Sequence, residues 1–321
     1  MNEMPLKAAD FASDQEVRWC PGCGDYAILK AVRQVLSEIG RSPDDVVFVS
    51  GIGCAARFPY YLSTYGFHTI HGRAPAVATG VKLANPDLDV WVVGGDGDFL
   101  SIGGNHVMHT LRRNVDLNLL LFNNAIYGLT KGQYSPTSPV GTRSPSTPSG
   151  SVEQPVNAAL FALGAGARFV ARSADTLQKH LPPVLKRAQA NKGASFVEIL
   201  QNCIVYFDGA FGPINEKTQA PDAIIELVHG EPMIFGKDRD KGLIYDAGGF
   251  QVVKLDDIGS EDELARHDER DLTRAFALAQ LKEPMALGVL YADPAPDFGA
   301  ARADAAPKKR LDREALRELL G

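Results

Sequence analysis

The chain has 321 residues, of which 45% are hydrophobic and 22% charged, and its formal net charge is -6. These proportions are typical of a globular protein with a full core, long enough for one large domain or two ordinary ones. The net negative charge argues against nucleic acid or an anionic membrane as a partner. Residues 1–10 lack a basic segment followed by an apolar one, and no later apolar run has the length of a membrane span, so we expect a cytoplasmic protein.

Hydrophobic periodicity predicts helices and strands that alternate through residues 22–200. Apolar residues at helical spacing predict a helix over 22–40, and the apolar run at 46–49 predicts a buried strand. The same reasoning predicts helices over 74–83, 102–113, 152–163 and 175–191, and strands over 89–94, 117–122, 167–171 and 195–200. Strands rich in Val, Leu and Phe between amphipathic helices indicate the α/β class, with a doubly wound, mostly parallel sheet. Ligands of such sheets bind at the carboxyl ends of the strands.

The alternation stops after Cys203. We therefore expect a ligand-binding domain over residues 1–220 and a C-terminal extension over 221–321 that packs on this domain or on a partner subunit. Within the extension, the pattern predicts a hairpin at 231–255, a helix at 261–281, a strand at 286–291 and a final helix at 311–320.

Residues 135–151 are rich in Ser, Pro, Thr and Gly, which is the composition of a flexible linker. The segment directly follows a candidate metal-binding loop, however, so an ordered surface loop beside a ligand is equally expected. The sequence leaves both interpretations open.

Two polar motifs follow predicted strands. Asp96 lies in the motif Gly95–Gly97 after the apolar run 90–93, and Asn124 follows the apolar run 117–122. A diphosphate needs a hard divalent cation and converging backbone N–H groups, and the cation prefers oxygen ligands. The Asp96 carboxylate, the Asn124 amide oxygen and the carbonyl of Ile126 could supply them. Either motif alone is most often a turn or a helix cap, but the pair is typical of thiamine-diphosphate enzymes.

The four cysteines predict a second site. Cys20 and Cys23 form a turn that presents two sulfurs to one centre, while Cys54 and Cys203 stand alone beside predicted strand ends. Zinc ribbons usually donate from two paired turns, whereas one pair and two distant cysteines suit the larger [4Fe–4S] cube. A zinc site, a redox pair and plain burial as small residues remain alternatives.

Taken together, the motifs resemble the β subunit of the 2-oxoacid:ferredoxin oxidoreductases. The resemblance covers roughly residues 15–220, and the segment from Arg57 to Thr137 most resembles the bacterial 2-oxoglutarate:ferredoxin oxidoreductases. It is carried by motifs that occur in this order: Trp19 to Gly24, Gly51 to Cys54, His71 to Ala74, Gly94 to Asp98, Asn123-Asn124 and Tyr127 to Gln133.

The resemblance implies roles for individual residues. A [4Fe–4S] cluster close to the thiamine would be held by Cys20, Cys23, Cys54 and Cys203, and Mg²⁺ by Asp96, Asn124 and Ile126. The diphosphate would be lined by Gly53, His71, Gly95, Gly97, Asp98, Gly128, Leu129 and Thr130. Arg57 is a candidate for a substrate carboxylate, since a fork of donors suits one, and Lys131 is a weaker candidate. Two of these have plain structural alternatives: a hydrogen-bonded core histidine for His71, and a surface salt bridge for Arg57.

The family resemblance also implies an activity. It is the coenzyme A-dependent oxidative decarboxylation of a 2-oxoacid, with 2-oxoglutarate expected, or the reverse carboxylation, and ferredoxin exchanges the electrons. In this family the glutamate that faces the aminopyrimidine belongs to a separate α subunit, so we expect an αβ or α2β2 assembly. Ferredoxin would dock on a local Lys/Arg patch or on the α subunit. Two alternatives remain: a subunit of a non-oxidative thiamine-dependent 2-oxoacid decarboxylase with structural zinc, and a catalytically silent scaffold.

Overall fold

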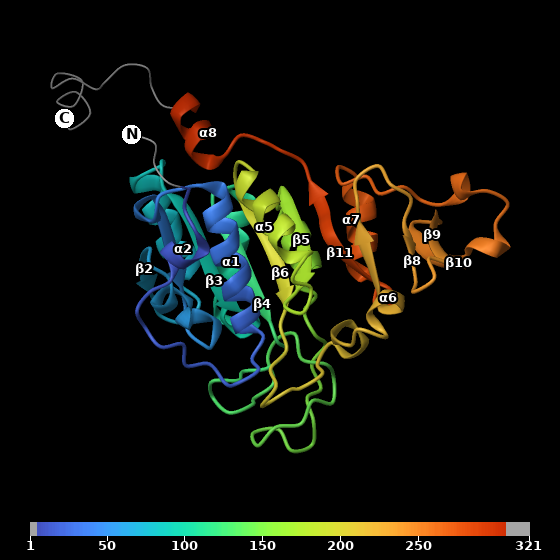
Figure 1. Cartoon of the computed structure of the whole chain (residues 1–321), viewed down its shortest axis with the longest axis horizontal. Coiled ribbons are helices and arrows are strands. Elements are labelled where there is room, and N and C mark those ends of the chain that lie inside the picture. The colour runs from blue at the N-terminus through green and yellow to red at the C-terminus, as the bar shows by residue number, and fades with distance from the viewer. Residues whose placement is uncertain (1–4, 306–321) are drawn as a thin grey trace, which may run out of the picture.

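An eight-stranded sheet forms the centre of the computed structural model, which describes residues 5–305 (Figure 1). The strand order is β2-β1-β3-β4-β6-β5-β11-β7, and all neighbours are parallel except β5 and β11. The expected doubly wound, mostly parallel α/β sheet is confirmed. Its strands are β1 (Val46–Ser50), β2 (Tyr65–His68), β3 (Asp89–Gly95), β4 (Asn118–Asn123), β5 (Phe169–Ala174), β6 (Ser195–Leu200), β7 (Ile224–Leu227) and β11 (Met285–Ala292).

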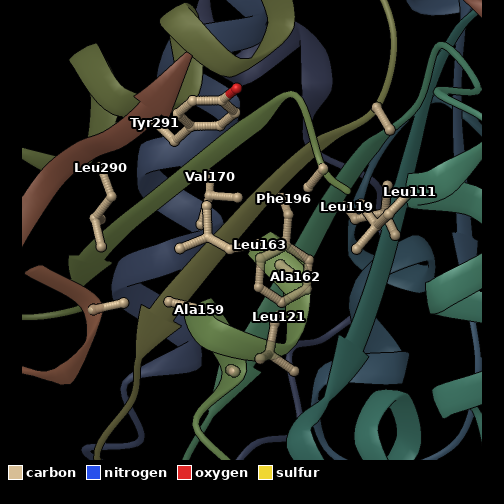
Figure 2. Close-up of a cluster of buried hydrophobic side chains, with 14 of the residues drawn as sticks. Leu111, Leu119, Leu121, Ala159, Ala162, Leu163, Val170, Phe196, Leu290 and Tyr291 are labelled. Atoms are coloured by element: carbon tan, nitrogen blue, oxygen red, sulfur yellow. The ribbon is translucent and has the colours of Figure 1, made fainter. Parts of the chain in front are cut away.

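Helices cover both faces because successive side chains of each central strand point to opposite sides. On one face, α2 (Ala74–Ala84), α3 (Gly104–Arg112), α4 (Ala158–Gly164) and α7 (Leu272–Gln280) share a core with alternate strand residues. Leu119, Leu121 and Phe196 belong to this core, beside Ala162 and Leu163 of α4 (Figure 2). On the other face, α1 (Asp25–Ile39) and α5 (Leu181–Ala190) pack on the intervening residues of the same strands. Both faces of the sheet are therefore buried, which is why the sequences of the central strands are nearly continuous apolar runs.

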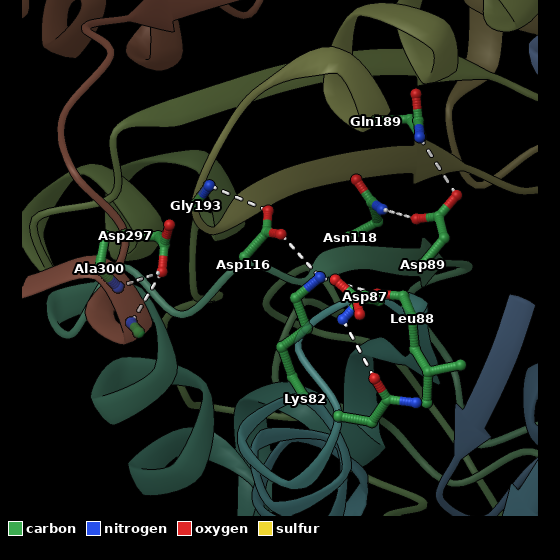
Figure 3. A network of polar contacts seen from close by, with 12 residues as sticks. Lys82, Asp87, Leu88, Asp89, Asp116, Asn118, Gln189, Gly193, Asp297 and Ala300 are labelled. Atoms are coloured by element: carbon green, nitrogen blue, oxygen red, sulfur yellow. Dashed lines mark hydrogen bonds and ion pairs between the residues drawn. The ribbon is translucent and has the colours of Figure 1, made fainter. Parts of the chain in front are cut away.

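The amino ends of the central strands are held by polar contacts (Figure 3). Lys82 of α2 lies 2.7 Å from a carboxylate oxygen of Asp116 and donates to the carbonyl of Leu88 at 2.7 Å. Asp89, at the start of β3, accepts from Asn118 at 3.1 Å and from Gln189 of α5 at 3.2 Å. The candidate site lies at the opposite, carboxyl ends of these strands, away from these contacts.

The segment after residue 220 contributes to the main sheet. After α6 (Ala220–Ala223), β7 pairs with β11, which in turn pairs with β5. The expected hairpin is formed by β8 (Ile234–Phe235) and β9 (Lys241–Asp246), and a third strand, β10 (Gly249–Lys254), extends it. The division into a domain over 1–220 and an extension over 221–321 stays a prediction.

Several predicted helices begin later than their apolar pattern suggested. The helix expected over 261–281 is α7, which begins after Asp271, whose carboxylate accepts from the backbone of Arg274 at 3.0 Å. The Asn157 side chain caps α4 in the same way. In α5 two prolines occupy the first turn, and the residue before a proline is disfavoured inside a helix. A last helix is α8 (Phe298–Ala305), and the helix expected over 311–320 lies outside the described residues.

Within residues 5–305, none of the helices combines the length and the apolar character needed to span a bilayer.

Candidate functional site

Four neighbouring strands, β1, β3, β4 and β6, end at the same edge of the sheet and lead into the loops at the bottom of Figure 1. The loops that follow them enclose a cavity of ≈ 80 Å³. Its lining includes all of the residues expected at a diphosphate and its metal: Gly53, His71, Gly95, Asp96, Gly97, Asp98, Asn124, Ile126, Gly128, Leu129 and Thr130. The cavity thus lies where the sequence predicts a ligand site, at the carboxyl ends of the parallel strands.

Asp96 is buried in the wall of this first cavity, with 1% of its surface exposed. One carboxylate oxygen accepts from the hydroxyl of Ser135 and, at 2.5 Å, from that of Thr137. Burial raises the pKa of Asp96 to about 6, although these hydrogen bonds oppose the shift. A carboxylate kept from water in this way fits a divalent cation, whose charge would offset the lost hydration.

Asn124 lies in a tight turn after β4. Its side-chain oxygen accepts from the backbone N–H of Ile126 at 3.2 Å, and that of Asn123 accepts from Ala125 at 3.2 Å. Ala125 has a φ of 55°, in the left-handed region that non-glycine residues rarely adopt. The turn is therefore strained, and such strain is typical of functional sites.

A buried chain of polar contacts connects this turn to Asp96. Arg172 donates to Glu198 at 2.7 Å, and Asn123 donates to the other oxygen of Glu198 at 2.8 Å. The hydroxyl of Thr137 lies 2.9 Å from the side-chain oxygen of Asn123 and 2.5 Å from Asp96. Because a hydroxyl has one proton, it donates to only one of these two oxygens at a time. The orientation of Asn123 is thus fixed by a buried ion pair behind the cavity.

The segment 135–151, whose composition allowed a linker, is an ordered loop. Ser135 and Ser138 are both 3% exposed. The Ser138 hydroxyl donates to the carbonyl of Ala125 at 2.6 Å and accepts from the backbone of Ser135 at 2.7 Å. The linker interpretation is wrong because the loop's small hydroxyl side chains satisfy buried acceptors around Asp96.

All four cysteines line a second cavity, of ≈ 140 Å³. The backbone N–H of Cys23 donates to the carbonyl of Cys20 at 3.0 Å, which closes the expected turn. A Cβ placed on Gly128 would lie at ordinary contact distance from two of the sulfurs, 3.5 Å from that of Cys203 and 3.9 Å from that of Cys54, so Gly128 lies beside both. Burial raises the pKa of the Cys54 thiol to about 12 and also raises that of Cys23. Such thiols ionise when a metal takes the place of the proton.

The two cavities share a wall. Both are lined by Cys54, Asn124, Gly128, Leu129 and Gln201. Within residues 5–305, no three His, Cys, Asp or Glu side chains are arranged to hold a single metal ion. Both metal sites therefore stay predictions, although the donors of each line a single cavity.

Asp98 and His71 are adjacent in the first cavity. One oxygen of Asp98 accepts from the backbone of Gly72 at 2.8 Å and of Ile52 at 3.2 Å, and it lies 3.1 Å from a ring nitrogen of His71. Burial is the main cause that raises the pKa of Asp98. Gly97 cannot carry a side chain, because a Cβ would lie 2.0 Å from the ring of Tyr127.

The two substrate candidates lie apart. Arg57 is half-buried, donates to the carbonyl of Arg18 at 2.9 Å and lines the cysteine cavity. It also lines an open pocket of ≈ 610 Å³ together with Gly53 and Leu129, which belong to the first cavity as well. Lys131 is exposed and is absent from the lining of all three.

Sequence reasoning missed two groups of residues at this site. Ser135 and Thr137 were hidden in a segment of linker composition. Gln201 directly follows β6, and its backbone N–H donates to the carbonyl of Asn123 at 2.8 Å. Its position after a predicted strand was the available signal, since polar residues at such ends face the ligand edge.

Comparison with known proteins agrees with the resemblance seen in the sequence motifs. The family model described as "Thiamine pyrophosphate enzyme, C-terminal TPP binding domain" matches residues 51–199. The 2-oxoglutarate oxidoreductase subunit KorB of Mycobacterium tuberculosis is 53% identical over 283 residues, which cover 88% of this chain and 75% of that protein. A 2-oxoacid:ferredoxin oxidoreductase subunit beta of Saccharolobus solfataricus is 46% identical over 192 residues, which cover 59% of this chain and 63% of that one.

Among solved structures, the chain is similar to a 2-oxoglutarate:ferredoxin oxidoreductase from Magnetococcus marinus with 2-oxoglutarate, coenzyme A and succinyl-CoA bound. The TM-score is 0.80 and the sequence identity 32%, over 100% of this chain and 98% of that chain.

Proposed function

The chain belongs to the β subunits of the 2-oxoacid:ferredoxin oxidoreductases, and we propose on this premise that it acts on 2-oxoglutarate. Together with an α subunit it would form succinyl-CoA and CO2, or catalyse the reverse carboxylation, and exchange electrons with ferredoxin. The observation that carries the proposal is the shared wall: the four cysteines line a cavity that adjoins the one lined by the diphosphate and metal candidates.

Thiamine diphosphate, when bound, supplies a carbon nucleophile and stabilises the negative charge left when CO2 departs. The protein would hold it through Mg²⁺ on Asp96, Asn124 and the carbonyl of Ile126. The glycines of the first cavity would let backbone N–H groups approach the phosphates, and the small hydroxyl side chains of Ser135 and Thr137 would orient the Asp96 carboxylate.

A [4Fe–4S] cluster on Cys20, Cys23, Cys54 and Cys203 would occupy the second cavity. Since this cavity shares its wall with the first, the residues of the wall alone would separate the two cofactors. Arg57 lines the open pocket next to both, and its guanidinium could pair the distal carboxylate of 2-oxoglutarate. An unpaired buried carboxylate would otherwise be costly. Exposed Lys131 could contribute only from outside the cavities, at an assembled interface.

The proposal is tested with the co-purified complex of this chain and its α subunit. We expect iron and acid-labile sulfide with a broad brown absorbance, and coenzyme A-dependent reduction of a low-potential acceptor that is fastest with 2-oxoglutarate. Stoichiometric zinc without iron would instead support the non-oxidative decarboxylase. A preference for pyruvate or a branched-chain 2-oxoacid would contradict the substrate, and a complex without any bound cofactor would contradict the activity.

A further inference from the structure

One side chain stands between the two cavities with a polar group turned to a cysteine. Gln201 is 1% exposed and lines both cavities. Its side-chain nitrogen lies 3.3 Å from the sulfur of Cys23 and donates to the carbonyl of Asn202 at 2.7 Å. Gly24 packs closely against Gln201: a Cβ on Gly24 would lie only 3.0 Å from the Cγ of Gln201.

The contacts decide which end of the amide faces the sulfur. The carbonyl of Asn202 can only accept, and a metal-bound cysteine sulfur likewise offers only an acceptor. If the amide were reversed, its oxygen would face both of them. The oxygen as placed is buried and has no partner within the described part of the chain. The amide orientation is thus set by its two N–H groups, one for each acceptor.

The backbone holds the glutamine in this place. Gln201 follows β6 and continues its pairing with β4 through the bond to Asn123. Asn202, next along the chain, donates its backbone N–H to Asp175 at 2.9 Å and its side chain to Asp208 at 2.7 Å. The side chain therefore reaches the sulfur from a fixed position.

We propose that Gln201 is a positioning residue that donates a hydrogen bond to the Cys23 sulfur of the cluster and raises the cluster's reduction potential. This inference rests on the proposed function, because it needs the cluster. An electron added to the cluster increases the negative charge on its sulfurs, so an N–H donor stabilises the reduced state more than the oxidised one.

The test is a redox titration, monitored by electron paramagnetic resonance, of the purified complex carrying Gln201→Met. Methionine keeps the length of the side chain and removes the donor. At a fixed potential, the ratio of reduced to oxidised cluster should fall several-fold, up to about tenfold, which for a one-electron couple corresponds to about 59 mV in midpoint potential. Iron content should remain that of the wild type.

Gln178→Met is the matched control. The amide of Gln178 donates to the carbonyl of Asp175 at 2.7 Å, but Gln178 lines neither cavity. The same substitution there should leave the midpoint potential unchanged. An unchanged midpoint in Gln201→Met with full iron content, or an equal shift in Gln178→Met, would overturn the inference.

A second measurement applies if Gln201→Met fails to retain iron. In wild-type complex labelled with ¹⁵N in glutamine side chains, we expect a nitrogen hyperfine coupling to the reduced cluster, and its absence would overturn the inference. A wild-type complex without iron would instead contradict the proposed function, which distinguishes the two failures.

Discussion

Replacing Asp96 with asparagine separates the carboxylate's charge from its shape. In Asp96→Asn the side-chain oxygen can still accept from Ser135 and Thr137, the two hydroxyl donors of the wild type. The anionic ligand proposed for Mg²⁺ is lost. We expect the affinity for thiamine diphosphate and Mg²⁺ to fall at least about a hundredfold, or ~2.7 kcal/mol.

The same substitution should stabilise the cofactor-free chain. Burial raises the pKa of Asp96 from 3.8 to about 6. Above both values, holding the ionised carboxylate in the fold costs ~3 kcal/mol. The sign follows from proton binding: between these values the folded chain binds the proton and the unfolded chain does not. The contribution of Asp96 to stability is therefore greatest below pH 3.8 and is lost as the pH rises through about 6. At pH 8 the free energy of unfolding should be up to ~3 kcal/mol higher for Asp96→Asn than for the wild type. Near pH 4 the variant should show no gain.

Urea unfolding without Mg²⁺ at both pH values measures this difference, and calorimetric titration with thiamine diphosphate and Mg²⁺ measures binding. Wild-type binding should also weaken more steeply than that of the variant below pH about 6, because Asp96 takes up a proton there. Wild-type affinity in Asp96→Asn would refute the assignment of the metal ligand. A variant less stable than wild type at pH 8 would refute the argument that burial of this charge is costly.

Four further predictions concern the complex and the fold. Arg57→Met should reduce kcat/KM for 2-oxoglutarate by ~2 kcal/mol more than for pyruvate, and equal losses on both acids would show that Arg57 does not select the substrate. Glu198→Ala leaves Arg172 buried without its ion-pair partner and should cost ~3–5 kcal/mol in urea unfolding; a loss below ~1 kcal/mol would contradict this. Cys54→Ser should lower the iron and sulfide content of the purified complex, and unchanged content would remove Cys54 from the ligands. The isolated chain should not oxidise 2-oxoglutarate until the α subunit is added, so turnover by the chain alone would contradict the need for a second subunit.

The main sheet could be predicted because its central strands are buried on both faces. Strands such as β4 and β6 are buried along their whole length and consist mostly of apolar residues, and each follows a helical pattern. The edge strand β2 was missed for the opposite reason. All four of its residues, Tyr65–His68, are exposed, so no buried face marks them as a strand. Its strand state depends on pairing with β1, which is a tertiary contact.

The first residue of a helix was less predictable than the existence of the helix. Apolar periodicity extends into the residues before α4 and α7, but the side chains of Asn157 and Asp271 accept backbone N–H groups and begin the helices there. Such caps compete with helix continuation, and apolar periodicity alone does not show which polar residue begins the helix.

At the candidate site, the sequence indicated residues that act through short motifs. The motif around Asp96 and the turn at Asn124 each lie within a few residues of a predicted strand. Their contacts with other residues of the site span much longer separations along the chain. Thr137 contacts Asp96 and Asn123 across 41 and 14 positions of the chain, and Gln201 reaches Cys23 across 178. No local pattern specifies such contacts, since they depend on which strand ends are neighbours in the sheet.

Asp98 shows how a residue can belong to a motif and act differently from its neighbours. The resemblance places it beside the diphosphate, yet its carboxylate accepts from the backbone of Ile52, after β1, and of Gly72, before α2. Glycines are required around it, because a Cβ on Gly51 would lie 2.0 Å from a carboxylate oxygen. One buried carboxylate thus joins the loops after β1 and β3 to the start of α2. Loops joined in this way hold their N–H groups in place before a ligand arrives, so less order must be gained on binding, and a flexible glycine-rich site becomes a preorganised one.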